Sequence, residues 1–482
     1  MDVLIVGAGL SGIGAAYRLQ TECPDRTFTI LEARDAIGGT WDLFRYPGVR
    51  SDSDMFTLSY PFRLWRQPRA IADGSSILRY IRDTAAAYGI DRKIRYHQRA
   101  VSAAWSSDEA RWTVRTAAGD EYTCSFLYLC TGYYRYAGGY EVDFPGMADF
   151  TGTIVHPQHW PADLDYDGKR VVVIGSGATA VTLVPSLAAN ASMVTMLQRS
   201  PSYFVAVPAR DDAATRLRRA LPERVATRVV RSRNLLLGWG LYQASRRWPD
   251  RIAELLRAGV ARQLPGGVPV DPHFVPNYGP WDQRLCVVPD GDLFAALRNG
   301  TAEIVTGTVE TFTDKGIRLA DGTELPADII VTATGLTMVP FGEMALTVDG
   351  RPIRSGDRHV YKGMMFDDVP NLAWCMGYPN ASWTLRADLT SRYVCRLLNY
   401  MTRHRIDVVT PERPKAETAT DRPMVALTSG YVRRAGDLLP RQGNRWPWRT
   451  STNYLTDLPA MRLGRIDDGS VRFARVAVGR AS

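Results

Sequence analysis

The sequence predicts an α/β fold with two similar strand–turn–helix units and a helical insertion in the second. A short apolar run precedes Gly7-x-Gly9-x-x-Gly12 near the N-terminus, and another precedes Gly175-x-Gly177-x-x-Ala180 in the middle of the chain. Helix-forming, arginine-rich sequence follows the second unit from residue 207 to residue 275. A strand, a glycine turn and a helix in this order form a Rossmann-like unit, whose glycines let the backbone approach a pyrophosphate at the helix N-terminus.

The first unit has every part of a dinucleotide site. Residues 3–6 are a continuous apolar run that suits a buried parallel strand, and residues 13–19 are helical in pattern. A second strand, 28–31, ends on Glu32, twenty residues after Gly12. A carboxylate at that distance takes the ribose hydroxyls. The position at the N-terminus resembles the FAD-binding unit of two-domain flavoproteins.

A loop rich in interacting side chains follows, from Gly38 to Asp52. Glycine pairs and Pro-Gly mark loops, and a loop that also holds Trp, Tyr, Arg and Asp is too rich in such groups for a plain connector. We expect it to lie against a flavin. The residues of the loop predicted to contact the cofactor are Gly39, Thr40, Trp41, Asp42 and Tyr46.

The second unit carries a cation where the first carries Glu32. The strand 193–197 is followed by Arg199, nineteen residues after Ala180. A guanidinium there pairs with a 2′-phosphate, which favours NADPH over NADH; the alternative is a surface arginine at a strand end. The predicted contacts in this unit are Gly175, Gly177, Thr179, Ala180, Arg199 and Ser200, together with Thr334 and Gly335 at a later crossover.

The formal net charge of +9 is concentrated in the insertion. Nine arginines lie between Arg216 and Arg247 against one acid, Glu223. Three interpretations stay open: a weak peripheral membrane contact by a basic amphipathic helix, a lid over the substrate site, and a helical insertion with a solvated basic face. Nucleic-acid binding is disfavoured, because charges elsewhere balance and no binding motif accompanies the run.

Composition indicates a folded, non-exported protein. With 45% apolar and 23% charged residues over 482 positions, two or three domains with sizeable cores are expected. The six cysteines form no C-x-x-C pair, which argues against a disulfide scaffold, a zinc site and a thiol relay. No stretch reaches the ~18 consecutive apolar residues of a membrane span. We therefore expect a cytoplasmic enzyme.

Residues 150–161 carry a family resemblance. They read F-x-G-x-x-x-H-x-x-x-W-P, which resembles the signature of Baeyer-Villiger monooxygenases, with fixed positions at Phe150, Gly152, His156, Trp160 and Pro161. The resemblance implies that this segment couples the nucleotide domain to the flavin domain. His156 is a proton carrier or a hydrogen-bonded hinge residue, and we favour the hinge.

The same resemblance implies the catalytic pair. Arg284 resembles the arginine that these enzymes place over the flavin, although this chain has Gln283 where many of them have a lysine. Asp52 falls where a loop aspartate orients that arginine. The turn before the helix at Trp383 resembles one that closes over the flavin ring. The implied chemistry is hydride transfer from NADPH to FAD, reaction with O2 and a C4a-peroxyflavin stabilised by the guanidinium.

Three further stretches resemble the ethionamide-activating subgroup: 39–48, 280–286 and 380–385. This implies oxidation of ketones to esters or lactones and oxygenation of sulfur in thioethers or thioamides. The alternatives are an N- or S-oxygenating flavin monooxygenase and an NADPH-dependent reductase with a protein partner. The expected domains are an FAD-binding domain from 1–145 and 336–482, an NADP-binding domain from 146–206 and 276–335, and the helical insertion 207–275.

Overall fold

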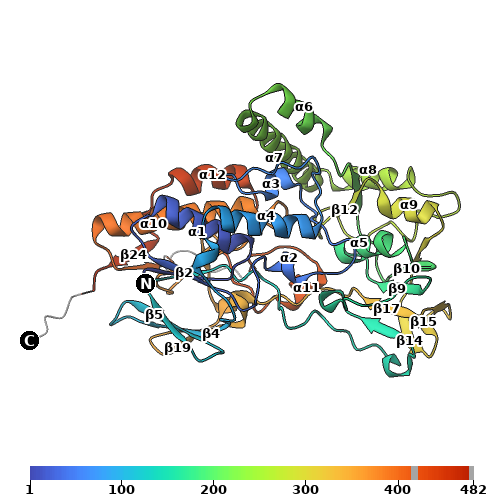
Figure 1. Cartoon of the computed structure of the whole chain (residues 1–482), viewed down its shortest axis with the longest axis horizontal. Coiled ribbons are helices and arrows are strands. Elements are labelled where there is room, and N and C mark those ends of the chain that lie inside the picture. The colour runs from blue at the N-terminus through green and yellow to red at the C-terminus, as the bar shows by residue number, and fades with distance from the viewer. Residues whose placement is uncertain (414–421, 477–482) are drawn as a thin grey trace, which may run out of the picture.

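Two parallel five-stranded sheets organise the molecule, as the computed structural model shows for residues 1–413 and 422–476 (Figure 1). The first has the order β22-β7-β1-β2-β3 and the second β13-β10-β9-β17-β8. The strand that enters each glycine turn, β1 (Val3–Val6) or β9 (Arg170–Ile174), is the middle strand of its sheet. The α/β fold with two such units, predicted from the glycine patterns, is confirmed.

Both faces of the first sheet are covered, so its strands are apolar throughout. Side chains alternate between faces: Val3 and Ile5 of β1 join the core beneath the helices, whereas Leu4 and Val6 join the core on the other face. The helices are α1 (Leu10–Glu22), α4 (Gly74–Ala87) and α10 (Trp383–His404). The other face meets a mixed sheet of β4 (Ala100–Ser106), β5 (Arg111–Thr116), β6 (Glu121–Cys124), β18 (Ala345–Val348) and β19 (Arg351–Ile353), in which β18 and β4 pair in parallel. The remaining strands of the first sheet are β2 (Phe28–Leu31), β3 (Ile94–Arg95), β7 (Phe126–Leu129) and β22 (Leu372–Trp374).

The second sheet repeats this arrangement. Val171 and Val173 of β9 pack toward helices, whereas Val172 and Ile174 pack toward a small antiparallel sheet. The helices are α5 (Ala178–Leu187) and α9 (Asp292–Arg298), and the small sheet is β14 (Val309–Thr313), β15 (Gly316–Leu319) and β16 (Glu324–Pro326). The other strands are β8 (Thr153–Val155), β10 (Met193–Gln198), β13 (Ala302–Thr306) and β17 (Ile329–Thr332).

The strands of the second sheet all lie between residues 153 and 332, whereas those of the first lie before residue 130 and at 372–374. The domain boundaries drawn from the sequence stay a prediction, and part of the second flavin-side segment, 414–421 and 477–482, lies outside the described residues.

A helical segment projects from the second unit. β11 (Phe204–Val207) pairs in parallel with β12 (Cys286–Pro289), and the chain between them forms α6 (Asp212–Ala220), α7 (Glu223–Arg247) and α8 (Pro249–Ala261). In Figure 1, α6 and the long α7 stand out from the top of the molecule. Shorter elements complete the chain: α2 (Thr40–Leu43), α3 (Met55–Leu58), β20 (Val360–Tyr361), β21 (Met365–Phe366), β23 (Val408–Pro411), α11 (Gly430–Arg434), α12 (Tyr454–Leu463) and β24 (Val471–Ala474).

Candidate active site

A cavity of about 1530 Å³ is lined by residues of both units. Pockets for one small ligand typically measure roughly 300–1,000 Å³, so this cavity has room for more than one. Its wall includes both glycine turns, the loop 39–53 and the segment that carries Arg284. The two nucleotide units therefore open into a shared space.

The first glycine of each unit occupies the same structural position. Gly7 has φ +105° and Gly175 has φ +145°, a region that other residues rarely adopt. A Cβ on Gly7 would lie 2.5 Å from the carbonyl oxygen of Cys130, and one on Gly175 would lie 2.5 Å from that of Ala333. Each glycine turn is thus packed directly against the strand end that leads into a Thr-Gly pair, 131–132 or 334–335.

The third positions of the two patterns do not reach the cavity wall. A Cβ on Gly12 would lie 1.9 Å from the carbonyl oxygen of Gly7, so Gly12 lets α1 approach the turn. Ala180, in the first turn of α5, is fully buried. Both residues pack helix against sheet, whereas Gly9 and Gly177 line the cavity.

Glu32 lies in the cavity wall as a buried carboxylate. Its oxygens accept hydrogen bonds from the backbone N–H groups of Ala8 (2.7 Å) and Arg34 (3.0 Å). Burial raises the pKa of Glu32, and the backbone donors and Arg34 oppose that rise. A carboxylate beside the Gly7–Gly9 turn fits the ribose of a dinucleotide.

Arg199 supplies the opposite charge in the second unit. It is exposed at the end of β10 and lines the cavity with Thr179 and Ser200. Within residues 1–413 and 422–476, no carboxylate lies within ion-pair distance of Arg199. We call each glycine turn with its charged residue a cradle: Gly7, Gly9 and Glu32 form the first, and Gly175, Gly177 and Arg199 form the second. The first cradle fits FAD, and the second fits NADP(H), whose 2′-phosphate would face Arg199.

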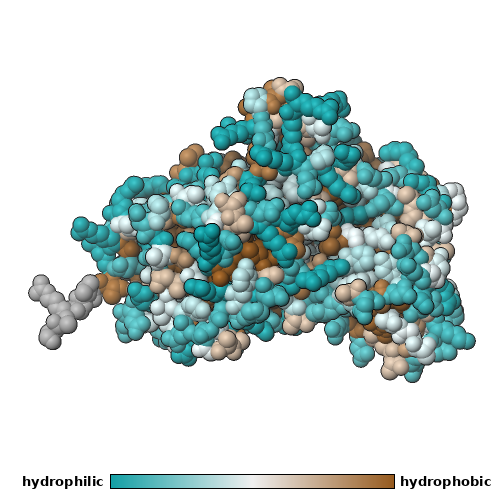
Figure 2. Space-filling view, viewed as in Figure 1, coloured by the Kyte–Doolittle hydropathy of each residue, from teal (hydrophilic) through white to brown (hydrophobic). Residues whose placement is uncertain are grey.

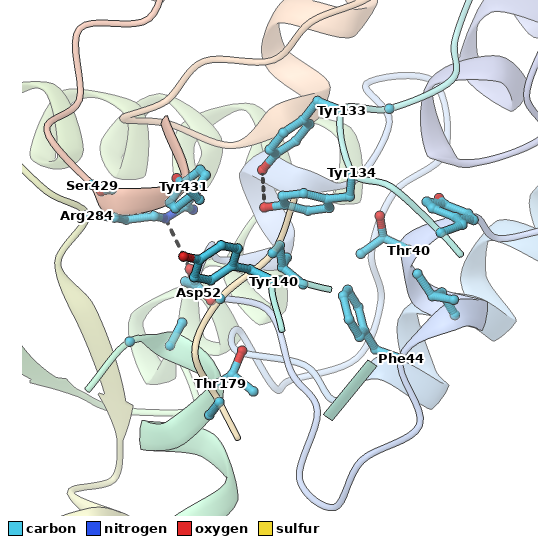
Figure 3. A pocket seen from close by; sticks show the side chains of 18 of the residues that line it. Thr40, Phe44, Asp52, Tyr133, Tyr134, Tyr140, Thr179, Arg284, Ser429 and Tyr431 are labelled. Atoms are coloured by element: carbon cyan, nitrogen blue, oxygen red, sulfur yellow. Dashed lines mark hydrogen bonds and ion pairs between the residues drawn. The ribbon is translucent and has the colours of Figure 1, made fainter. Parts of the chain in front are cut away.

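The structure brings Arg284 and Asp52 together. Nε of Arg284 lies 3.1 Å from Oδ2 of Asp52, and both side chains face the cavity (Figure 3). Burial lowers the pKa of the Arg284 guanidinium, but Asp52 and neighbouring tyrosines outweigh burial, so the pKa ends above its ordinary value. The cation is permanently charged and is held by a residue 232 positions earlier in the chain.

Tyrosines surround this pair, and the sequence analysis missed them. The hydroxyls of Tyr133 and Tyr134 lie 2.5 Å apart, and Tyr431 lies beside Arg284 (Figure 3). The ring of Tyr133 stacks on Trp383 at 4.9 Å between centroids. The signal was present, since four of the eight residues 133–140 are tyrosines, but the segment reads as a linker.

The loop after Gly38 divides between two roles. Gly39, Thr40 and Trp41 line the cavity. Asp42 does not, because its buried carboxylate binds three arginines: Arg34 at 2.6 Å, Arg82 at 3.2 Å and Arg45 at 3.6 Å. Tyr46 lines the cavity and also packs in the core of the second unit.

The signature segment lies beside the cavity and not in its wall. The ring of Phe150 packs against Phe312, a Cβ on Gly152 would lie 2.4 Å from the carbonyl oxygen of Asp328, and Trp160 packs against the core beneath α5. Pro161 is half-buried in the loop that follows. These residues belong to the packing of the second unit around β8.

His156 sits at a junction of three segments. Its Nδ1 accepts a hydrogen bond from the backbone N–H of Gln158 (3.2 Å), and a Cβ on Gly139 would strike its ring. Burial lowers the pKa of His156, and the backbone of Gly335 opposes this. Gln158 in turn donates to the carbonyl oxygens of Arg135 (2.8 Å) and Tyr136 (3.1 Å). The segment therefore touches both the tyrosine-rich stretch and the crossover at Gly335; the hinge role stays a prediction.

Other site types find no support in the part of the chain that the structure describes. All six cysteines are free and buried. No cluster of three or more His, Cys, Asp or Glu suited to a metal ion occurs among the described residues. None of the described helices is long and apolar enough to cross a membrane.

Comparisons with known sequences identify the family. Residues 4–232 match the model of the pyridine nucleotide-disulphide oxidoreductase family. The chain is 54% identical to the FAD-containing monooxygenase EthA of Mycobacterium tuberculosis over 479 residues, 98% of each chain. It is 49% identical to EthA of Mycolicibacterium smegmatis over 487 residues, covering 100% of this chain and 99% of the relative.

Solved structures agree on the fold. A steroid monooxygenase bound to NADP superposes with a TM-score of 0.77 at 23% identity, covering 98% of this chain and 99% of its own. A cyclohexanone monooxygenase bound to epsilon-caprolactone superposes with a TM-score of 0.74 at 20% identity, with the same coverage. The resemblance to EthA-type enzymes is confirmed by sequence, the fold is that of Baeyer-Villiger monooxygenases, and the chain belongs to the family of FAD-containing monooxygenases.

Proposed function

We propose that this enzyme uses NADPH and O2 to carry out Baeyer-Villiger oxidation of ketones to esters or lactones, and that it also oxygenates sulfur in thioethers or thioamides. The observation that carries the proposal is the Arg284–Asp52 pair, which faces a cavity shared by two dinucleotide cradles. The relatives named EthA support the monooxygenase class, and the fold shared with a caprolactone-bound enzyme supports the lactone-forming reaction.

The residues that would hold the cofactors follow from the two cradles. FAD would bind at Gly7, Gly9 and Glu32, with the loop at Gly39–Trp41 alongside. NADP(H) would bind at Gly175, Gly177 and Thr179, with Arg199 and Ser200 near its 2′-phosphate. When bound, the flavin accepts a hydride from NADPH and supplies the redox chemistry with O2.

Arg284 would stabilise the negative charge that develops on oxygen in the cavity. Asp52 lies against Nε of the guanidinium and would hold it in place, and no second carboxylate among the described residues forms an ion pair with Arg284. The Arg284 side chain is 36% exposed, so its charge is partly shielded from solvent, and a fixed cation in such a site is worth more than one in bulk water. Tyr133, Tyr431 and Trp383 supply apolar ring surface around it.

The segment from Phe150 to Pro161 would transmit motion of the second unit to this site. His156 and Gln158 connect β8 to the tyrosine-rich stretch and to Gly335. Burial lowers the pKa of His156 and so favours its neutral form. A neutral, hydrogen-bonded histidine suits a hinge residue.

The test is the variant Arg284→Ala. Loss of a charge-stabilising donor costs about 3 kcal/mol, so ketone oxidation should fall by roughly 10²–10³-fold while anaerobic flavin reduction by NADPH stays within about twofold. The control is Arg115→Ala, which removes an exposed arginine of the β5–β6 hairpin. Normal ketone conversion by Arg284→Ala would rule out the assignment.

We further propose that α7 contacts an anionic membrane surface. Four of the nine arginines bind neighbouring elements: Arg218 the carbonyl of Trp65, Arg231 that of Phe56, Arg233 the carboxylate of Asp211, and Arg246 that of Asp282. The exposed remainder includes Arg216, Arg219, Arg224, Arg228 and Arg247.

An apolar stripe accompanies these exposed arginines. Val225, Val229, Leu236 and Trp239 recur at helical spacing and are 41–53% exposed, and Leu237 beside them is 65% exposed. Figure 2 shows hydrophobic and hydrophilic residues side by side on the projecting helices. Apolar side chains bordered by arginines suit a bilayer with anionic headgroups. The buried free thiols support a reducing compartment, and we place the enzyme in the cytoplasm, on the inner membrane surface.

A further inference from the structure

The loop between α2 and α3 is anchored to the first unit by its backbone. The N–H of Ser51 donates to the carbonyl oxygen of Ala72 (3.0 Å), and the N–H of Gly74 donates to that of Val49 (2.7 Å). These bonds tie the loop to Ala72, just before α4, and to Gly74, the first residue of α4. Its path is therefore set by the unit that would carry FAD.

The side chains of the same loop enter the second unit. Tyr46 is 8% exposed and belongs to the hydrophobic core beneath α5. Gly48, with φ +75°, is packed so tightly that a Cβ would lie 1.9 Å from Oγ of Ser186 on α5. The loop thus presses on the helix whose N-terminus would receive the second nucleotide.

Two ion pairs join this loop to the segment 284–292. The loop supplies the cation of one pair and the anion of the other. Arg50 forms an ion pair with Asp292, the first residue of α9, and Asp52 forms one with Arg284. Arg284 and Asp292 lie on either side of β12 (Cys286–Pro289). Arg50 and Asp292 are 13% and 31% exposed, so solvent screens their pair only in part.

We propose that Arg50 and Asp292 are positioning residues that hold Asp52 in register against Arg284. The proposal rests on the role proposed above for Arg284. A slip of the loop along β12 in one direction would bring Arg50 toward Arg284, and a slip in the other direction would bring Asp52 toward Asp292. Like charges at close range repel each other. The opposite order of charges in the two pairs therefore favours the one register in which each cation meets an anion. The Arg50–Asp292 pair itself touches no reacting atom.

The expected consequence of breaking the pair is uncoupling, with little effect on nucleotide use. Asp292→Asn and Arg50→Gln each leave Asp52 less firmly placed. Small displacements of groups in an active site lower the reaction rate strongly. We expect the oxygenated product formed per NADPH to fall about fivefold, with the remaining electrons released as hydrogen peroxide. The KM for NADPH and the anaerobic rate of flavin reduction should stay within about twofold.

The experiment measures product, peroxide and NADPH in the FAD-loaded enzyme for both single variants and the double variant. Each variant breaks the same Arg50–Asp292 pair. The double variant should therefore lose no more product per NADPH than either single variant. Asp292→Glu keeps the charge and should restore most of the coupling. Glu121→Gln, which breaks an exposed ion pair of the β5–β6 hairpin, is the matched control. Unchanged coupling in Asp292→Asn, or additive losses in the double variant, would overturn the proposal.

A readout that needs no oxygenated product separates this proposal from the proposed function. Thermal unfolding of Asp292→Asn, Asp52→Asn and their combination forms a double-mutant cycle. If the two pairs support each other, the shifts in unfolding midpoint should be non-additive. Additive shifts would contradict the positioning role even if the unsubstituted enzyme forms no ester, whereas absence of ester alone would contradict only the proposed function.

Discussion

We attribute the proposed choice of nucleotide in each unit to a single residue, Glu32 in the first and Arg199 in the second. Glu32 is buried and held by two backbone donors, whereas Arg199 stands exposed at the matching strand end. A carboxylate at the second position would repel a 2′-phosphate, and a guanidinium attracts it. We propose that the exchange of one acid for one base between two otherwise similar units sets the preference for NADPH.

This preference can be measured with Arg199→Gln. A hydrogen bond to a charged group contributes about 1.5–3 kcal/mol, so the KM for NADPH should rise roughly tenfold to a hundredfold. The KM for NADH, which lacks the 2′-phosphate, should change by less than about twofold. Arg170→Gln, at the opposite end of the second sheet, is the control. Equal effects on the two nucleotides would contradict the role of Arg199.

The limits of sequence reasoning are clearest at this scale. Glu32 and Arg199 could be found because their distance from a glycine turn is fixed by local chain geometry. Tyr133 and Tyr431 could not, because they meet Arg284 only after segments from three parts of the chain have packed, whereas Trp383 was among the predicted cofactor contacts. Asp42 was expected to contact the cofactor, but it lies outside the cavity wall in ion pairs with Arg34, eight residues earlier, and Arg82, forty residues later.

At the scale of elements, the glycine-turn units were predictable because each is local. The strand, turn and helix of a unit lie within about twenty residues, and alternate burial of β1 and β9 follows from the pleat. The helical character of α7 was equally local. The contacts of its arginines with other elements were not predictable, since Arg231 and Arg246 bind partners far away in the sequence.

The outward face of α7 can be tested with lipid vesicles. Each arginine near an anionic surface contributes about 1 kcal/mol, so Arg224→Gln/Arg228→Gln should weaken binding to phosphatidylglycerol vesicles roughly 30-fold. Leu236→Ser/Leu237→Ser should weaken it as well, and 0.5 M NaCl should weaken binding of the unsubstituted enzyme through screening.

The matched control removes two arginines from surface hairpins on other elements, Arg115→Gln/Arg318→Gln. Co-sedimentation that ignores the anionic lipid would contradict the membrane contact. Self-association of the enzyme through α7, with no binding to the vesicles, would also contradict the membrane contact.

At the scale of the whole molecule, two similar units face one another across a shared cavity. The α7 helix extends from the exposed stripe to the segment before Arg284, where Tyr242 packs edge-to-face on Trp281 at 5.7 Å and Arg246 binds Asp282 at 2.7 Å. The fold class followed from the two glycine patterns. The shape of the cavity did not, because loops from both units and the C-terminal part of the chain complete its wall.

The account as a whole depends on oxygen insertion into a carbonyl compound. The most direct measurement supplies the FAD-loaded enzyme with NADPH, a simple cyclic ketone and ¹⁸O2, and follows product mass together with NADPH consumption. The account predicts a lactone that carries one ¹⁸O atom and is formed nearly one-for-one with NADPH oxidised. Consumption of NADPH that yields only hydrogen peroxide, with ketone and sulfide substrates left unchanged, would contradict it.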